Sequence, residues 1–271
     1  MVCICPCGKD AAATVWFVRL QTRGIEDDIS MTALRPIVVG SHPGDPCAHC
    51  DVRHQSVCSA IDDADLARLA AASVTREVER GQVFIDEGEP ATDFFNITRG
   101  SVKLFKLLPD GRQQVTGFAG VGHFLGLAVS ATYSFSAEAI EPLRMCRFSR
   151  PRLRLLLDDF PVLEKRLLET ACNELAAAQE QMLLLGRKTA RERVASFLMA
   201  RSGAAAPCGG SDRVKLPMTR AEIADYLGLT LETVSRTFSK FRAEKRISTP
   251  SNSEVIILDR RWLENLAAGM M

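Results

Sequence analysis

Short runs of alternating hydrophobic and polar residues fill the chain between Val78 and Phe148. Runs at 83–85, 94–97 and 102–105 are among them, and glycines separate successive runs at intervals that suit tight turns. Alternation with a period of two, bounded by turn residues, is typical of β-strands with one buried face. Because the runs are short and follow one another closely, they predict an antiparallel sandwich or jelly roll.

After Pro151 the hydrophobic positions repeat every seven residues, which predicts a long helix over 151–186. Two such series, three positions apart, form an a/d seam like that of a coiled-coil dimer. A stripe of this kind can also pack on its own domain, but the small alanines within it and the domain boundary that follows favour dimerisation. The predicted seam consists of Leu168, Ala171, Leu175, Ala178, Met182 and Leu185.

Two short helices joined by a tight turn are predicted over 218–238. Thr219 can cap the first helix together with Glu222, three residues later, in a capping box. Gly228 would end that helix in the left-handed conformation, and Thr230 would cap the second helix. The two helices would share an apolar core of Ile223, Leu227, Val234, Phe238 and Phe241, with the small Ala224 where they cross. This arrangement is a helix-turn-helix.

The second of these helices carries side chains suited to reading bases. Glu232, Ser235 and Arg236 lie at i, i+3 and i+4 near its N-terminus, where a major groove would admit them. Glu can accept from cytosine and Arg can donate two hydrogen bonds to guanine, although these two side chains can also form an ion pair within the helix. Strand-like segments at 246–248 and 255–258 then predict a β-hairpin wing. Five other side chains suit contacts to the DNA backbone, namely Thr219, Arg220, Thr233, Lys240 and Arg242.

The chain has 271 residues, of which 46% are hydrophobic and 25% are charged, with a net charge of +1. This composition is ordinary for a globular protein of two domains and excludes a disordered or collagen-like chain. The charge is uneven, because residues 187–250 hold thirteen Lys and Arg against six Asp and Glu. A basic module on an acidic body is typical of nucleic-acid-binding proteins, although a basic face can also simply be solvated.

Membrane, export and enzyme signals are weak. No segment reaches the roughly 18 uninterrupted apolar residues of a membrane span, since glycines and His123 break the best stretch, 118–135. Lys9 and Asp10 stand where a signal peptide would need its apolar core, so we expect a cytoplasmic protein that binds no membrane. No Ser/His/Asp set, phosphate-binding loop or pair of carboxylates indicates an enzyme.

Three of the nine cysteines lie close together in one loop, at Cys47, Cys50 and Cys58. Clustered thiols in a reducing compartment favour zinc or an iron–sulfur cluster over disulfides, and a fourth ligand must come from elsewhere. His49 or His54 could substitute for one thiol, but we expect both to be ordinary loop residues. A C-x-x-C pair can also be the catalytic dithiol of an oxidoreductase, but turn residues rather than a strand precede it here, which argues against that function.

The order of jelly roll, long helix and helix-turn-helix across residues 47–268 resembles the Crp/Fnr transcription regulators. The segments 218–220, 226–230 and 232–236 are similar to the recognition motif of the oxygen-sensing Fnr branch. That motif's Glu, Ser and Arg fall on Glu232, Ser235 and Arg236. The resemblance implies an α+β fold and a symmetric homodimer on double-stranded DNA, at an inverted repeat close to TTGAT and ATCAA.

Members of the Fnr branch hold an oxygen-labile [4Fe–4S] cluster on four cysteines, and by resemblance Cys146 takes the fourth position beside Cys47, Cys50 and Cys58. Seven residues separate Cys50 from Cys58 here, whereas a gap of five also occurs within the Fnr branch. The longer gap is a departure within that pattern. By resemblance the cluster would promote dimerisation and DNA binding, and oxygen would dismantle it. A zinc-stabilised or thiol-oxidation sensor that uses the same four thiols is an alternative.

Cyclic-nucleotide-binding members of the family hold ribose and phosphate with a Gly-Glu and an Arg-Ser pair. The corresponding stretches here, 122–126 and 135–137, lack the Glu and the Arg. Because a phosphate buried without a guanidinium would be an unpaired charge, we expect no cyclic nucleotide. The resemblance also implies contact with RNA polymerase, for which the turn 109–112 and the surface near Pro142 are candidates.

Four regions are therefore expected: a flexible N-terminal extension, a sensor domain with the cysteine loop, a dimerisation helix and a winged helix-turn-helix domain. They span 1–46, 47–150, 151–186 and 187–271. The remaining cysteines are expected to be a small packed residue (Cys172), an accessible loop thiol (Cys208) and a run too closely spaced for one tetrahedral site (Cys3, Cys5 and Cys7).

Overall fold

The computed structural model of the chain describes residues 47–270 apart from 128–130 and 204–211. The expected extension over 1–46, with its three cysteines, and Cys208 lie outside the described residues. Among those that are described, no helix combines the length and the apolarity that a membrane span requires.

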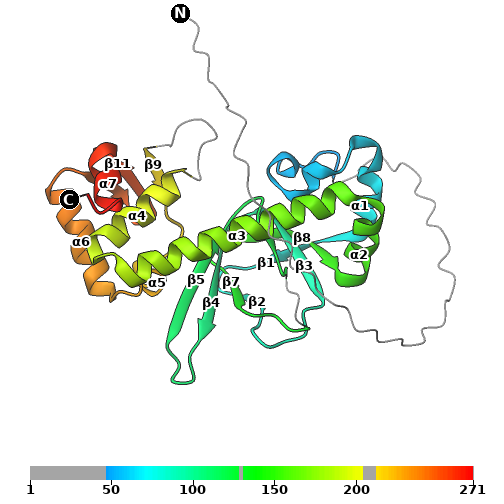
Figure 1. Cartoon of the computed structure of the whole chain (residues 1–271), viewed down its shortest axis with the longest axis horizontal. Coiled ribbons are helices and arrows are strands. Elements are labelled where there is room, and N and C mark those ends of the chain that lie inside the picture. The colour runs from blue at the N-terminus through cyan, green and yellow to red at the C-terminus, as the bar shows by residue number, and fades with distance from the viewer. Residues whose placement is uncertain (1–46, 128–130, 204–211, 271) are drawn as a thin grey trace, which may run out of the picture. The chain divides into compact units, whose positions relative to one another are not determined.

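Two four-stranded antiparallel sheets form the sensor domain (Figure 1), with strand orders β1-β8-β3-β6 and β2-β7-β4-β5. Burial alternates at the start of β8, where Leu143 and Met145 enter the core while Arg144 is exposed. The strands are β1 (Ser73–Val78), β2 (Val83–Ile85), β3 (Asp93–Arg99), β4 (Val102–Leu107), β5 (Gln113–Ala119), β6 (Phe124–Leu125), β7 (Ser136–Ala139) and β8 (Leu143–Ser149).

The segment before β1 folds into short helical turns that pack on this sandwich. They are the 3-10 helices η1 (Arg53–Gln55), η2 (Val57–Ala60) and η3 (Asp63–Asp65) and the α-helix α1 (Leu66–Ala72). Gly122 has φ +87°, and a Cβ there would lie 2.7 Å from the carbonyl oxygen of Gln55. Glycine is needed here both for the positive φ and because a side chain would collide with the Gln55 carbonyl. This close approach holds the cysteine loop against the sheet.

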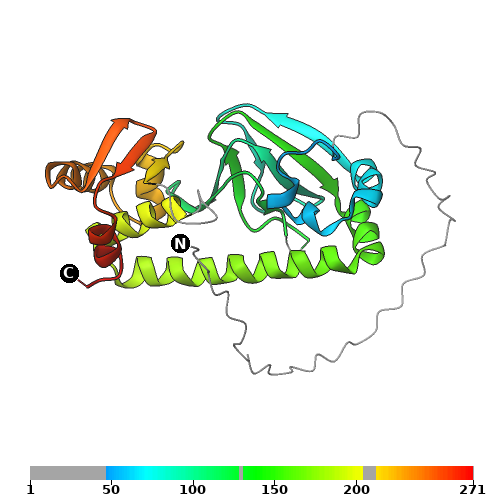
Figure 2. The ribbon, with the colours of Figure 1, turned by 90° about the horizontal axis from the view of Figure 1, so that it is seen from above.

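The segment expected as one helix over 151–186 is two helices, α2 (Arg150–Asp159) and α3 (Pro161–Arg187). Phe160 between them has φ −127° and ψ 79°, as the residue before a proline prefers an extended conformation. α3 is then a continuous helix of 27 residues (Figure 2). Leu163, Leu167 and Leu184 are its buried residues, near its two ends, whereas every residue over 171–180 is exposed.

The C-terminal domain contains four helices and a three-stranded sheet. α4 (Ala190–Gly203) and β9 (Arg213–Lys215) precede the helix pair α5 (Arg220–Leu227) and α6 (Leu231–Ala243), and the wing β10 (Ile247–Ser251) and β11 (Glu254–Ile257) and the last helix α7 (Arg260–Ala267) follow it. The fold class predicted from the sequence, an α+β chain of jelly roll, long helix and winged helix-turn-helix, is confirmed.

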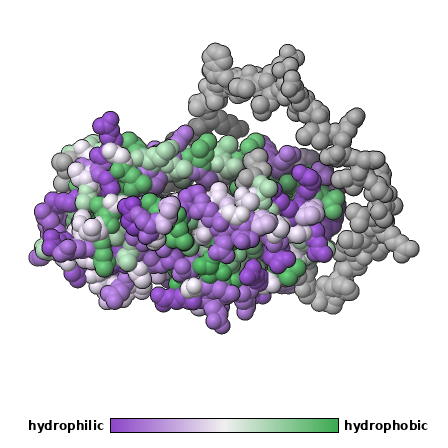
Figure 3. Space-filling model, turned by 90° about the horizontal axis from the view of Figure 1, so that it is seen from below, coloured by the Kyte–Doolittle hydropathy of each residue, from purple (hydrophilic) through white to green (hydrophobic). Residues whose placement is uncertain are grey.

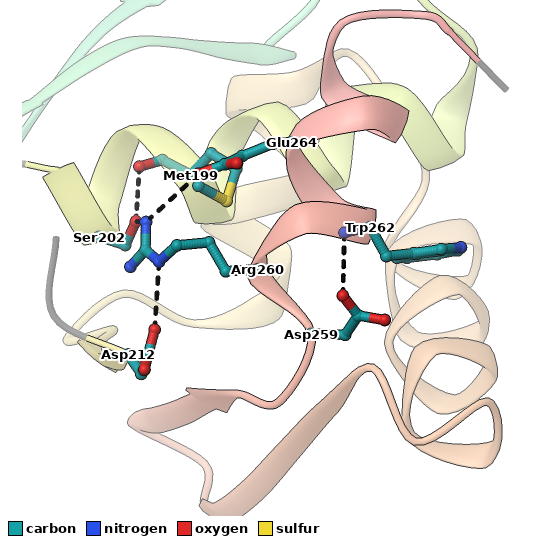
Figure 4. Close-up of polar contacts among 7 residues, drawn as sticks. All are labelled: Met199, Ser202, Asp212, Asp259, Arg260, Trp262 and Glu264. Atoms are coloured by element: carbon teal, nitrogen blue, oxygen red, sulfur yellow. Dashed lines mark hydrogen bonds and ion pairs between the residues drawn. The ribbon is translucent and has the colours of Figure 1, made fainter.

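A polar cluster joins α7 to α4 and to the start of β9 (Figure 4). The Arg260 guanidinium donates to Asp212 at 3.2 Å and to the Ser202 hydroxyl at 3.4 Å. Asp259 caps α7 by accepting from the backbone N–H of Trp262 at 3.0 Å. Since Ser202 is fully buried, its hydrogen bonds to Arg260 and to the Met199 carbonyl provide the partners that a buried hydroxyl needs.

Candidate nucleic-acid interface and thiol cluster

Local hydrogen bonds define both helices of the helix-turn-helix as the sequence predicts. The Glu222 backbone N–H donates to the Thr219 hydroxyl at 3.2 Å, and the Thr219 N–H donates to the Glu222 carboxylate at 2.7 Å, which completes the capping box. Gly228 ends α5 with φ +60°. The Thr230 hydroxyl accepts from the Thr233 N–H at 3.2 Å at the start of α6. All five predicted core residues of the pair are buried, as is Ala224.

The three predicted base-reading residues lie exposed on α6. Arg236 donates to Glu232 at 2.6 Å, and these side chains remain 78% and 70% exposed. An ion pair of this kind between exposed side chains is worth only about 0.3–0.5 kcal/mol. The pair can therefore separate at little cost, leaving both groups and Ser235 available to base edges.

Two of the predicted backbone contacts share a groove of about 300 Å³ between α6 and the wing, lined by Arg220 and Arg242. The Arg220 guanidinium lies 3.6 Å from the centroid of the Phe238 ring, and its Nη1 has no hydrogen-bond partner among the described residues. Burial, followed by the charge of Arg242, lowers the pKa of Arg220 to about 10. An anion in this groove would relieve both effects, which suits a DNA phosphate.

The other three predicted backbone contacts differ in their surroundings. Thr219 and Lys240 are exposed, whereas Thr233 is half-buried and already engaged in the cap of α6. The structure therefore leaves Thr219 and Lys240 accessible to a DNA strand, and Thr233 near the N-terminus of the recognition helix.

Four cysteines from two distant parts of the chain line one pocket, together with Arg53 and Asn96. Cys47, Cys50 and Cys58 come from the N-terminal loop, in which the Cys50 N–H donates to the Cys47 carbonyl at 3.4 Å. Cys146 comes from the middle of β8. The lining residues are Cys47, Cys50, Arg53, Cys58, Leu69, Ser73, Thr75, Asn96, Cys146 and Phe148.

The thiols of this pocket influence one another electrostatically. Burial raises the pKa of Cys58, to which the neighbouring Cys50 adds. Burial, followed by Cys58 and Cys50, raises the pKa of Cys146 to about 11. Thiolate formation at one sulfur therefore disfavours it at the next, and a cationic ligand would reverse this because it attracts all four thiolates.

Neither histidine of the loop lines the pocket. His49 and His54 are both exposed, and the ring of His54 hydrogen-bonds the Gln55 side chain at 3.0 Å. Within the described ranges, no group of three or more Cys, His, Asp or Glu side chains stands in position for a single metal ion.

The predicted dimer seam faces outward from the chain. Leu168, Leu175 and Met182 are 64%, 60% and 64% exposed, and Figure 3 shows hydrophobic patches on a largely hydrophilic face of the molecule. Ala171 and Ala178 are exposed as well, whereas Leu185 is half-buried against the helix-turn-helix core. Cys172, expected as a packed residue, is exposed, because no element among the described residues covers positions 171–180 of α3.

Comparison with known proteins gives matches to both domains. Residues 75–160 match the cyclic nucleotide-binding domain, and residues 192–266 match the Crp-like helix-turn-helix domain. The nitrogen fixation regulation protein FixK of Bradyrhizobium diazoefficiens is 40% identical over 237 residues, which cover 87% of this chain and 100% of that protein. The chain belongs to the Crp/Fnr family of transcription regulators.

Other Crp/Fnr proteins agree with this assignment. The transcriptional activator protein FnrL of Cereibacter sphaeroides is 38% identical over 218 residues, covering 79% of this chain and 88% of that protein. The structure of FixK2 from Bradyrhizobium japonicum superimposes with a TM-score of 0.67 at 34% identity, covering 72% of this chain and 96% of that one. The chain is thus a DNA-binding transcription activator of this family and not an enzyme, as the sequence predicts.

A charged contact between the two domains of this Crp/Fnr chain was not predicted from its sequence. Lys103 on β4 is almost buried, and its Nζ lies 3.0 Å from Glu138 on β7 and 3.3 Å from Glu222 on α5. The only sequence signal is that this lysine interrupts an otherwise apolar run at 102–105.

Neutral contacts accompany that ion pair. The Gln114 amide donates to the Asp225 carbonyl at 2.6 Å. The Phe118 ring of β5 lies 5.3 Å from the Tyr226 ring and 6.4 Å from that of Phe197, centroid to centroid. Burial raises the pKa of Tyr226. The sheet β2-β7-β4-β5 and the first helix of the helix-turn-helix therefore share a continuous polar and aromatic interface.

Proposed function

We propose that this regulator senses oxygen through a [4Fe–4S] cluster held by Cys47, Cys50, Cys58 and Cys146. In this proposal the loaded chain dimerises through the seam on α3 and binds an inverted-repeat operator. Loss of the cluster in oxygen returns the chain to a form that binds DNA weakly. The observation that carries the proposal is the convergence of four cysteines, from a loop and from a central strand, on one pocket.

The donor set suits this cofactor, because four thiolates are the usual ligands of such clusters. When bound, the cluster would supply an iron–sulfur centre that oxygen can degrade. The chain provides a buried wall for it, with Cys58 only 8% exposed, and two arginines, Arg53 and Arg144, whose charges favour the thiolate forms of Cys58 and Cys146. The buried Asn96 side chain belongs to the same wall, and its Nδ2 donates to the Cys58 sulfur at 3.7 Å.

The direction of the thiol pKa values disfavours a sensor based on thiol oxidation alone. Reactive cysteines have lowered pKa values, since the thiolate is the nucleophile. Here burial raises the pKa values of Cys58 and Cys146, so both stay protonated near neutral pH. A metal centre overcomes this by displacing the protons as it binds.

Dimerisation through α3 would connect the sensor to DNA binding. The apolar side chains exposed along 168–182 are the surface that a second copy would bury, and burying a leucine contributes about 1.5–3 kcal/mol. A coupling of only about 1–3 kcal/mol between cluster occupancy and dimer formation changes operator affinity by about 5- to 150-fold.

We also propose that the sensor domain binds no cyclic nucleotide and that RNA polymerase contacts its exposed turn 109–112. Ser136 is buried and its hydroxyl accepts from the Glu87 backbone N–H at 3.0 Å, while Ala137 beside it is fully buried. In the exposed turn, Asp110 accepts from the Arg112 N–H at 3.0 Å and from its Nε at 2.7 Å. These bonds give the turn a fixed shape, which suits a protein contact.

The decisive experiment is purification of the full chain without oxygen, followed by iron, sulfide and zinc analysis. We expect a brown protein with stoichiometric iron and sulfide that bleaches in air. Cys146→Ser should lose the iron, whereas Cys172→Ser, the matched control at an exposed cysteine on α3, should retain it. Zinc without sulfide would indicate the zinc-stabilised alternative, and a colourless, metal-free protein would refute the cluster proposal.

A gel-shift assay on an inverted-repeat operator tests the second half of the proposal. Operator binding by the anaerobic protein should weaken after exposure to air, in parallel with the loss of colour. If operator affinity is the same before and after exposure to air although the colour is lost, the cluster does not control DNA binding. The seam substitution described in the Discussion distinguishes a failure of dimerisation from a failure of the recognition helix.

A further inference from the structure

Asn96 is a buried polar residue that directly borders the thiol pocket. It lies in β3, directly opposite Cys146 of β8 in the strand register, and is 1% exposed. Its Nδ2 donates to the Cys58 sulfur at 3.7 Å. One amide therefore contacts the cysteine loop from the very strand pair that carries the fourth thiol.

The surroundings of Asn96 would favour an apolar residue at this position. Phe94 on the same strand and Phe124 and Phe148 on the neighbouring strands belong to the apolar cluster that also contains Cys58. Leaving a buried polar atom without a partner costs about 1–3 kcal/mol, and Asn96 Oδ1 is such an atom among the described residues. Packing alone does not account for an amide here, whereas donation to a sulfur does.

We infer that Asn96 is a positioning residue for the cluster, which donates an N–H···S hydrogen bond to the Cys58 thiolate. This inference rests on the proposed function. A donor to the charged form of a thiol stabilises that form, and hydrogen bonds to ligand sulfurs set the reduction potential of an iron–sulfur centre. Asn96 thereby holds Cys58 at the correct side of the pocket and raises the potential of the centre.

Two substitutions separate this role from simple packing. Asn96→Leu keeps the number and branching of the side-chain heavy atoms and suits the apolar surroundings, but removes the donor. Asn96→Asp keeps the shape and replaces the donor by a carboxylate facing a thiolate. Removing a hydrogen-bond partner of a metal ligand typically costs about 10- to 100-fold in metal affinity, and we expect a loss of this size in iron retention against a chelator for both variants.

Thr98→Val is the matched control. Thr98 lies two residues further along β3 and its hydroxyl donates to the Arg144 carbonyl at 2.9 Å, so the control removes a side-chain hydrogen bond of the same strand that does not reach a sulfur. Each full-length variant is reconstituted without oxygen and measured for iron retention, reduction potential and the Fe–S(Cys) stretching frequencies in resonance Raman spectra. Urea unfolding of the metal-free proteins verifies that each variant folds.

The expected result is a lower potential and a shifted Fe–S(Cys) stretch for Asn96→Leu, with Thr98→Val unchanged. A purely structural role would alter unfolding but leave the frequency and the potential of the remaining centre unchanged. Retention, potential and stretch equal to those of the unmodified chain in both Asn96 variants would overturn the inference while the cluster stands. An unmodified chain that binds no cluster would instead overturn the proposed function, and the inference with it.

Discussion

Replacing Lys103 by Met removes a buried cation that lies between the sensor domain and the helix-turn-helix. Its Nζ lies 3.0 Å from Glu138 Oε2 and 3.3 Å from Glu222 Oε1, and the side chain is 10% exposed. Both carboxylates are also largely shielded, at 23% and 16% exposure. Without the lysine, two carboxylates from different domains would face each other in a low-dielectric interface. Their repulsion and lost solvation should destabilise the folded chain.

The expected magnitude follows from this burial. Breaking a fully buried pair by removing one partner costs about 3–5 kcal/mol, and the remaining exposure of the two carboxylates lowers this to about 2–4 kcal/mol. For a chain of this size, each kcal/mol lowers the melting temperature by roughly 2–4 °C. We therefore expect Lys103→Met to melt about 5–15 °C lower than the unmodified chain.

Lys106→Met is the matched control, because Lys106 lies on the same strand and pairs with Glu87 while remaining 49% exposed. Such exposed pairs contribute about 0–1 kcal/mol. A double-mutant cycle with Glu222→Gln then isolates the contact between domains, since Gln at this position can still complete the capping box of α5. Urea unfolding of the four proteins should give a coupling of about 0.5–3 kcal/mol. A loss no larger than that of Lys106→Met, or a coupling of zero, would refute the assignment of Lys103 as a link between domains.

Three further predictions concern dimerisation, base recognition and pH. Leu175→Glu places a charge in the seam on α3 and should convert the anaerobic protein to a monomer, measured by sedimentation velocity. The control Glu174→Gln, at the neighbouring position, should leave the dimer intact. A dimeric Leu175→Glu protein would place the interface elsewhere. Arg236→Ala should weaken binding to the operator by about 1–3 kcal/mol and leave non-specific binding almost unchanged. Titrations with operator DNA and with scrambled DNA measure the two affinities. An equal loss of affinity for both DNAs would mean that Arg236 contacts only the DNA backbone. Burial acts to raise the pKa of Glu141, but the hydrogen bonds from Lys215 and Ser101 outweigh it and lower the pKa below its usual 4.5. The stabilisation from the ionised carboxylate is therefore complete above pH 4.5 and is lost as the pH falls through the folded pKa. Glu141→Gln should accordingly reduce the loss of stability at acidic pH in urea unfolding, and an unchanged pH dependence would contradict this.

The helix-turn-helix could be predicted from sequence because its determinants are local. A capping box depends on residues three apart, and the end of α5 depends on one glycine with positive φ, so Thr219, Glu222 and Gly228 are sufficient to define it. The seven-residue repeat predicted α3 in the same way. The break at Phe160 is also local, since Pro161 follows it, but a continuous apolar pattern on both sides obscured it.

The parts of the site that escaped prediction all depend on distant segments meeting. Lys103 contacts carboxylates from β7 and from α5, and no pattern in β4 indicates which residues it faces. Asn96 is one polar residue in a mostly buried strand, and only the strand register places it opposite Cys146 and next to the cysteine loop. Sequence spacing can nominate ligands of one type, such as thiols, but it does not identify the uncharged residue that donates to them.

α3 is the element that both candidate sites contact. At its start, Leu163 and Leu167 share an apolar cluster with Cys58. At its end, the Arg193 guanidinium of α4 donates to the carbonyls of Leu185 and Leu227, each at 2.8 Å, and so ties the last turn of α3 to the end of α5. α3 is one continuous helix of 27 residues, so it provides a structural connection between the cysteine loop at one end and the helix-turn-helix at the other. The exposed seam lies between these ends, so in the proposed mechanism this one helix would couple cluster occupancy to both dimerisation and DNA recognition.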